Sequence, residues 1–167
     1  LSIAPRNCVT VLDTHDGIGI VDVGPEGDKA GLLTHEQIDN LVETIHHNSQ
    51  GQSRKATGAA ASNVDLYQVN CTYLDALGNN KQDYLLARAI QFFAPGIPQV
   101  YYAGVLGLNN DMALLAKSQV GRDINRPYLD DATLQDALTT PFFGAMKTLI
   151  KLRNTHPAFN GEFTISL

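Results

Sequence analysis

The chain has 167 residues, of which 44% are hydrophobic and 17% are charged, and it is long enough for one compact domain with a sizeable core. Its formal net charge of -5, without any run rich in Lys or Arg, argues against nucleic acid as the main partner. No apolar stretch approaches the length that spans a bilayer, and the first residues show no secretory signal, so we expect a cytoplasmic protein without a membrane partner.

The two cysteines, Cys8 and Cys71, stand in apolar or strand-like surroundings, so we expect both to be reduced, buried thiols. Neither belongs to a Cys/His spacing that binds zinc. His46 and His47 are adjacent on an expected helix and point to different faces, so they cannot readily share an ion. Residues 109–111 lack the spaced acidic pattern of a calcium loop. We therefore expect no metal site.

The first expected element is a buried strand over residues 8–12, which are apolar and rich in β-branched side chains. A polar cluster, residues 13–17, follows directly where a strand would give way to a loop. Residues 18–23 are mostly apolar, and the Gly-Pro-Glu-Gly sequence at 24–27 predicts a turn.

A helix is predicted from Thr34 onward, because Thr34 and Gln37 have the spacing of a capping box. We expect this helix to end near residues 46–48. The apolar residues of its expected buried face are Ile38, Leu41, Val42 and Ile45. Residues 49–63 are small and polar, a composition that predicts a long surface loop.

A second helix is predicted over residues 82–93 and stops at Pro95 and Gly96. The apolar residues of its pattern are Leu85, Leu86, Ala89, Ile90 and Phe93. Residues 97–102 then predict a second strand. The following loop, from 103 to about 130, is longer than an ordinary connection, and loops of that length in compact domains are usually functional.

A third helix is predicted to begin at Thr140 and Pro141, a capping side chain followed by proline at the first helical position. Its apolar residues are Phe142, Phe143, Met146, Leu149 and Ile150. Residues 161–167 alternate in polarity and predict a strand. Strands that alternate with helices in this order favour an α/β fold with parallel strands, and two such units could be the last quarter of a barrel.

Four stretches carry a resemblance to one family. Residues 11–16 look like the seventh strand of the α-amylase superfamily barrel, and the longer run 12–19 resembles the sucrose phosphorylases of that superfamily (glycoside hydrolase family 13). Residues 58–70 resemble their mobile substrate loop. Residues 95–102 resemble the eighth strand, and 121–126 a further active-site loop.

The resemblance implies the C-terminal part of a (β/α)8 TIM barrel over residues 1–160, with a C-terminal β domain starting at 161–167. It also implies phosphorolysis of sucrose to α-glucose 1-phosphate and fructose by double displacement, with inorganic phosphate as co-substrate and no organic cofactor. Asp16 matches the carboxylate that stabilises the transition state. A fixed carboxylate can strengthen its hydrogen bonds to sugar hydroxyls as the ring distorts, and His15 can donate to a neighbouring hydroxyl.

In the resembling family the substrate loop takes two positions, which here would present Asp65 to fructose or Tyr67 to phosphate, with Gln68 beside them. A carboxylate repels phosphate, whereas a phenol donates to it. Arg122 would be a planar, permanently charged partner for phosphate, and Arg126 is a weaker candidate of the same kind. The alternative for Arg122 is a surface ion pair with Asp123 or Asp130.

A retaining mechanism needs two carboxyl groups about 5 Å apart, and no second Asp or Glu of this chain matches the nucleophile or the general acid. We therefore expect a fragment that is inactive alone and completes its site with the upstream barrel. Alternatives are a phosphorylase of sucrose 6′-phosphate or glucosylglycerate, or a non-catalytic piece that acts only by assembly. The chain could also form a homodimer.

Overall fold

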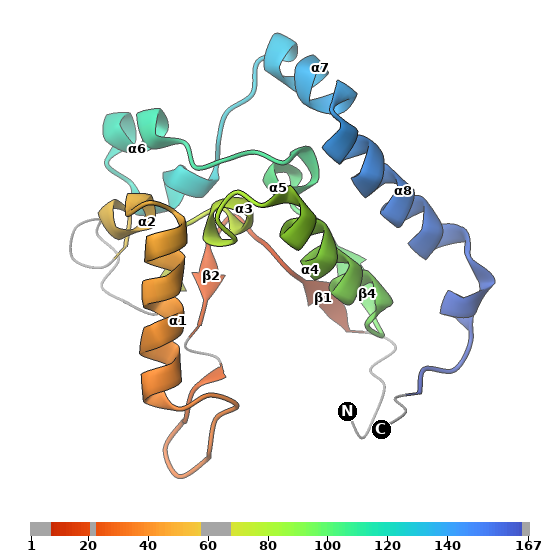
Figure 1. Cartoon of the computed structure of the whole chain (residues 1–167), viewed down its shortest axis with the longest axis horizontal. Helices are drawn as coiled ribbons and strands as arrows, with labels where there is room; N and C mark the ends of the chain where they lie inside the picture. The colour runs from red at the N-terminus through yellow and green to blue at the C-terminus, as the bar shows by residue number, and fades with distance from the viewer. Residues whose placement is uncertain (1–7, 21–22, 58–67, 165–167) are drawn as a thin grey trace.

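The structure, a computed structural model, describes residues 8–20, 23–57 and 68–164 (Figure 1). Strand β1 (Val9–Val11) pairs in parallel with β4 (Ile97–Gln99), and Thr10 stands opposite Pro98. The parallel pairing predicted from the order of strands and helices is confirmed. The second strand is shorter than predicted, because Tyr101 and Tyr102 belong to the start of the next helix.

A second, antiparallel pair joins β2 (Ile18–Gly19) to β3 (Gln68–Val69), and the sequence did not predict it. Gly17 precedes β2 with φ +87°, and a Cβ on it would lie 2.5 Å from the carbonyl oxygen of Val69. Glycine therefore permits both the left-handed backbone and the close approach of β3.

Helix α1 (His35–Asn48) begins as predicted. Thr34 Oγ1 accepts from the backbone N–H of Gln37, and the Gln37 side chain accepts from the N–H of Thr34 at 2.8 Å. Such a cap typically contributes about 1 kcal/mol.

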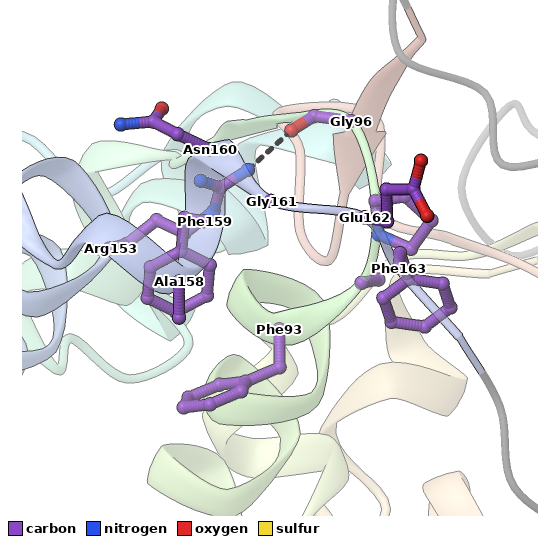
Figure 2. A pocket seen from close by; sticks show the side chains of 11 residues that line it. Phe93, Gly96, Arg153, Ala158, Phe159, Asn160, Gly161, Glu162 and Phe163 are labelled. Carbon is purple, nitrogen blue, oxygen red and sulfur yellow. Dashed lines mark hydrogen bonds between the residues drawn. The ribbon is translucent and has the colours of Figure 1, made fainter.

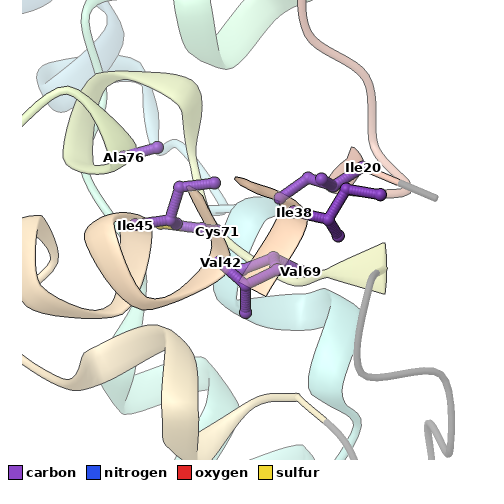
Figure 3. Packing of buried hydrophobic residues seen from close by; sticks show 7 residues of the cluster. All are labelled: Ile20, Ile38, Val42, Ile45, Val69, Cys71 and Ala76. Carbon is purple, nitrogen blue, oxygen red and sulfur yellow. The ribbon is translucent and has the colours of Figure 1, made fainter. Parts of the chain in front are cut away.

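The buried face of α1 packs on the β2–β3 pair (Figure 3). This cluster consists of Ile20, Ile38, Val42, Ile45, Val69, Cys71 and Ala76. Leu41 was predicted on this face, but its side chain is 39% exposed. The buried stripe of α1 is therefore narrower than predicted.

The predicted surface loop 49–63 is wrong in its described part, residues 49–57. This part contains the short helix α2 (Gln52–Lys55), and four of its side chains are buried. They are Ser49, Ser53, Ala56 and Thr57. Small polar side chains can be buried here because they are hydrogen-bonded: Ser53 Oγ lies 2.7 Å from His46 Nδ1 and from Ser49 Oγ.

Helix α4 (Lys81–Phe93) spans almost the predicted range, but none of the apolar residues of its predicted pattern is buried. Leu86 and Ile90 are 62% and 67% exposed, and Phe93 is exposed as well. The buried residues of α4 are Tyr84, Arg88, Gln91 and Phe92. Three of these four are polar, and their hydrogen bonds to Asp13 and to the backbone of β1 and β4 compensate for their burial.

The stretch 103–130 is largely helical, so the predicted long loop is wrong in its structure. It contains three helical segments after β4. They are α5 (Tyr102–Leu106), α6 (Met112–Ser118) and the 3-10 helix η3 (Gly121–Asn125). Asp111 caps α6 by accepting from the backbone N–H of Leu114 at 2.8 Å.

Helix α8 (Pro141–Thr155) begins with the predicted Thr140 cap and packs along α4 (Figure 1). Three further segments were not predicted. They are α3 (Tyr73–Ala76), α7 (Asp131–Thr139) and η4 (Pro157–Asn160). Residues 161–164 form no strand, and the rest of the predicted tail strand lies outside the described residues.

Within the described part of the chain, no helix is long and apolar enough to cross a membrane. Both cysteines are free, but only Cys71 is buried; Cys8 is exposed, contrary to the prediction, because it lies at the start of the open β1 strand. Burial raises the pKa of the Cys71 thiol to about 12. The thiol therefore remains protonated in neutral solution.

We expect Cys71 to resist thiol reagents while the protein is folded, because the thiolate is the nucleophile. In a Cys8→Ser variant at pH 8, the rate of reaction with a disulfide reagent should rise on the order of 100-fold on unfolding in urea. A Cys71→Ser variant, which keeps the exposed Cys8, should react rapidly in both states. Rapid reaction of folded Cys8→Ser protein would contradict the burial of Cys71.

Burial, together with the nearby Arg54 charge, lowers the pKa of His46. The unfolded chain therefore binds more protons than the folded chain below about pH 6.5, and the free energy of unfolding should fall as the pH drops through that value. In His46→Asn protein this fall should be smaller. Urea unfolding at pH 5 and pH 7.5 checks it, with the exposed His47→Asn as the matched control; equal pH dependence in both variants would refute the assignment.

Candidate active site

Asp16 lies in the loop beyond the carboxyl end of β1 and gathers three cationic or ionisable side chains. Arg122 Nη1 is 2.9 Å from Asp16 Oδ1, and Arg126 Nη2 is 3.7 Å from the same oxygen. His15 Nε2 is 3.4 Å from Asp16 Oδ2. The Asp16 side chain is 45% exposed, so it remains open to a ligand.

The backbone around Asp16 is held by side chains from other segments. Asn125 Nδ2 and Arg126 Nε both donate to the carbonyl oxygen of His15 at 2.9 Å. The N–H of Asp16 donates to Thr14 Oγ1 at 3.0 Å. Residues far apart in sequence therefore fix the position from which the Asp16 carboxylate projects.

The structure brings together His15, Asp16 and Arg122, which the sequence indicated as site residues. Arg122 pairs with Asp16 rather than with Asp123 or Asp130. Arg126 contributes more than the sequence indicated, because it contacts the carboxylate of Asp16 and the backbone of His15. No spacing pattern in the sequence links residue 126 to residue 15, so this role depends on the fold.

Gln68 also reaches this loop: its Nε2 donates to the carbonyl oxygen of Asp16 at 2.7 Å. Its neighbours in the predicted substrate loop, Asp65 and Tyr67, lie outside the described residues. The amide of Gln68 thus holds the backbone of the site from β3, in addition to its predicted place near a substrate.

Asp13, three residues before Asp16, belongs to a buried polar network that the sequence did not predict. Arg88 Nη2 donates to Asp13 Oδ1 at 2.6 Å, and the Tyr84 hydroxyl donates to Asp13 Oδ2 at 2.5 Å. Tyr84 and Arg88 are fully buried, and Asp13 is nearly so. Gly104 packs against this pair, and a Cβ on it would overlap the Asp13 carboxylate and the Tyr84 hydroxyl.

Two tyrosines hold the η3 segment that carries Arg122. The Tyr101 hydroxyl donates to the carbonyl oxygen of Asn125 at 3.0 Å, and the Tyr102 hydroxyl donates to that of Pro127 at 2.9 Å. Burial, together with hydrogen bonding to Tyr102, raises the pKa of Tyr101. The hydrogen bonds of these two phenols tie η3 and the residues after it to α5.

A pocket lies at the opposite end of the β1–β4 pair, beside the amino end of β4 (Figure 2). Its volume is about 420 Å³. Arg153 stacks on Phe159 and donates to the carbonyl oxygen of Gly96 at 2.7 Å, while Phe93 and Phe163 form apolar walls. The pocket is therefore separate from the Asp16 loop, which follows the carboxyl end of β1.

Among residues 8–20, 23–57 and 68–164, no group of three or more His, Cys, Asp or Glu side chains could hold a metal ion. Residues 109–111 have structural roles instead. Asn109 Nδ2 donates to Asp75 Oδ1 at 2.9 Å, the N–H of Asn110 donates to Asp75 Oδ2 at 2.5 Å, and Asp111 caps α6.

The chain has a mixed α/β fold and is similar to glycoside phosphorylases. No protein-family model matches it. It is 64% identical to a sucrose phosphorylase of Agrobacterium vitis over 167 residues, which are 99% of this chain and 34% of that protein. It is 56% identical to a sucrose phosphorylase of Bifidobacterium adolescentis over 165 residues, covering 97% of this chain and 33% of that protein.

Among solved structures, the chain matches the crystal structure of sucrose 6F-phosphate phosphorylase from Thermoanaerobacter thermosaccharolyticum with a TM-score of 0.78 and 38% identity. The match covers 97% of this chain and 31% of that one. The resemblance to sucrose phosphorylases that the motifs indicated is thus confirmed. The chain spans about a third of the length of the relatives it matches.

We expect Gly104→Ala to lower the free energy of unfolding by about 2 kcal/mol or more, because the new methyl group must displace the Asp13–Tyr84 contact. Gly144→Ala is the matched control. A Cβ at this exposed position within α8 meets nothing within 4 Å, so alanine should stabilise the helix by about 0.5–1 kcal/mol. Urea unfolding measures both, and equal effects would contradict the packing of Gly104.

Proposed function

We propose that this chain is the C-terminal part of the (β/α)8 catalytic barrel of a sucrose phosphorylase, with β1 and β4 as the seventh and eighth strands. The complete protein would convert sucrose and phosphate to α-glucose 1-phosphate and fructose, and the reverse. The observation that carries the proposal is the position of Asp16 beyond the carboxyl end of β1, within a chain 64% identical to a sucrose phosphorylase.

The parallel β1–β4 pair supports the barrel. Neighbouring strands of a barrel pair in parallel and are separated by a helix, here α4. Val9, Val11 and Ile97 are exposed on this pair, as expected if further strands and core side chains cover them in the complete protein. Residues 1–160 would belong to this barrel and residues 161–167 would begin a C-terminal β domain.

In this proposal Asp16 stabilises the oxocarbenium-like transition state through its hydrogen bonds to the glucosyl ring. Its pairs with Arg122 and Arg126 involve half-exposed side chains, and such pairs contribute little to stability. Sugar hydroxyls can therefore replace water around the carboxylate without disrupting the fold. His15, one residue earlier, would donate to an adjacent hydroxyl.

The other substrate-binding assignments are Gln68, Asp65, Tyr67 and Arg122. Gln68 supports them because its side chain reaches the Asp16 loop. Asp65 would bind the fructosyl hydroxyls, and Tyr67 would donate to the phosphate that attacks the glucosyl-enzyme. Arg122, 2.9 Å from Asp16, could bridge that carboxylate and an incoming anion.

The nucleophile and the general acid would come from the upstream barrel, so the isolated chain would be inactive. No metal or organic cofactor takes part in this reaction, in which phosphate is the co-substrate. Plain sucrose is favoured over sucrose 6′-phosphate or glucosylglycerate, because Asp65 would repel an acceptor that carries a phosphate or carboxylate.

A second candidate is a non-catalytic piece that acts only by assembly, either with the rest of the barrel or as a homodimer. The exposed apolar side chains of α4 favour association of some kind. This candidate predicts binding without any contribution of Asp16 to turnover.

We expect Asp16→Asn, in the full-length protein carrying this chain, to lower kcat for phosphorolysis of sucrose at least about 100-fold, because the charge that stabilises the transition state is lost. Phosphate-dependent release of α-glucose 1-phosphate measures it. Asp28→Asn, which removes the same charge at an exposed position, should leave kcat unchanged.

Full activity of Asp16→Asn would refute the catalytic role of this residue. A parent protein that acts only on sucrose 6′-phosphate or glucosylglycerate would keep the mechanism and overturn the choice of substrate. A parent protein that splits none of these glucosides would favour the non-catalytic candidate.

A further inference from the structure

The buried polar network around Asp13 lies on the inward face of α4, where apolar side chains would be expected. The side of α4 that faces the strands carries Tyr84, Arg88 and Gln91, while the apolar Leu86 and Ile90 face outward. A buried ion pair is often no more stabilising than apolar side chains of similar volume. Stability alone therefore does not explain why the polar face of α4 is the one turned inward.

The network connects both strands of the parallel pair. Arg88 Nη1 donates to Gln91 Oε1 at 2.6 Å, which orients the Gln91 amide. Gln91 Nε2 then donates to the carbonyl oxygen of Thr10 in β1 at 2.6 Å and to that of Gln99 in β4 at 2.9 Å. One amide thus joins the two strands near their carboxyl ends.

The same arginine holds the residue from which the site loop departs. Arg88 Nη2 and the Tyr84 hydroxyl occupy both carboxylate oxygens of Asp13, three residues before Asp16. From Asp13 onward the loop is held by its own contacts, including those of Asn125 with the carbonyl oxygens of Thr14 and His15.

We propose that Arg88 is a positioning residue of the active site: through Asp13 and Gln91 it fixes the strand ends and thereby the direction in which the Asp16 carboxylate projects. This inference rests on the proposed function, because it assigns Arg88 a role in the same reaction. Arg88 touches no substrate. Its effect on turnover passes through the two strand ends and the backbone between Asp13 and Asp16.

The test removes both charges together, because Arg88→Met alone would leave the Asp13 charge buried without a partner. In Asp13→Asn/Arg88→Met no buried charge remains, and the Tyr84 hydroxyl can still donate to the amide oxygen. Arg54→Met is the matched control, since Arg54 forms an exposed pair with Glu43 away from the site. Assays are run on the full-length protein at a temperature where circular dichroism shows each variant fully folded.

We expect the double variant to lower kcat for sucrose about 10- to 100-fold while KM changes less than about threefold, because misdirection of Asp16 affects the transition state more than substrate binding. When Asp16 is already Asn, the same double change should cost less than about threefold. A merely structural role would leave kcat of the folded variant unchanged. Losses that multiply in the Asp16→Asn background would show that Arg88 does not act through Asp16, and either result overturns the proposal.

A second readout does not depend on activity. Amide hydrogen exchange of peptides covering residues 13–17 should be about tenfold faster in the double variant and unchanged in Arg54→Met. Unchanged exchange in the double variant would overturn the positioning role. If exchange accelerates but the parent protein shows no phosphorolysis, the proposed function fails and the structural link from Arg88 to the Asp16 loop stands.

Discussion

Asp13 and Arg88 place opposite charges out of contact with water where the carboxyl end of β1 meets α4. Such charges are stable only if each keeps its partner and its hydrogen bonds, so the network tolerates very few arrangements. Tyr84 supplies the second donor to Asp13, and Gly104 leaves the space in which the pair fits. The relative positions of β1, α4 and α5 all depend on this contact.

A few residues further along the chain, the same kinds of side chain serve a different purpose. The pairs of Asp16 with Arg122 and Arg126 lie at the surface, where water screens them. Breaking the inner pair would leave a buried charge without a partner. The pairs of Asp16 with Arg122 and Arg126 can give way to hydrogen bonds with a polar ligand at little cost in folding free energy. Under the proposed function, the fixed backbone would hold the Asp16 carboxylate in place while its outer contacts give way to substrate hydroxyls.

Local signals in the sequence predicted local structure well. The capping side chains of Thr34 and Thr140 gave correct starts for α1 and α8, because a cap depends on residues within one turn. The buried face of α4 could not be predicted, because hydrophobic periodicity cannot show that Arg88 is compensated by Asp13, 75 positions away. The helical content of 103–130 was missed since its segments are short. Motif resemblance indicated His15, Asp16 and Arg122, which the structure brings together, whereas the contacts of Arg126 appear only when η3 folds against the Asp16 loop.

The orientation of α4 also adds to the apolar surface that the chain exposes. Two parallel strands with open edges do not form a stable sheet alone, and β1 and β4 expose Val9, Val11 and Ile97. The outward apolar residues of α4 add to this uncovered surface. The chain spans about a third of its relatives' length, and under the proposed function the rest of such a protein would cover this surface. Under the proposed function, the contacts that bury these strands would also bring the nucleophile and the general acid toward Asp16, so the stability of the barrel and the assembly of the active site would be one event.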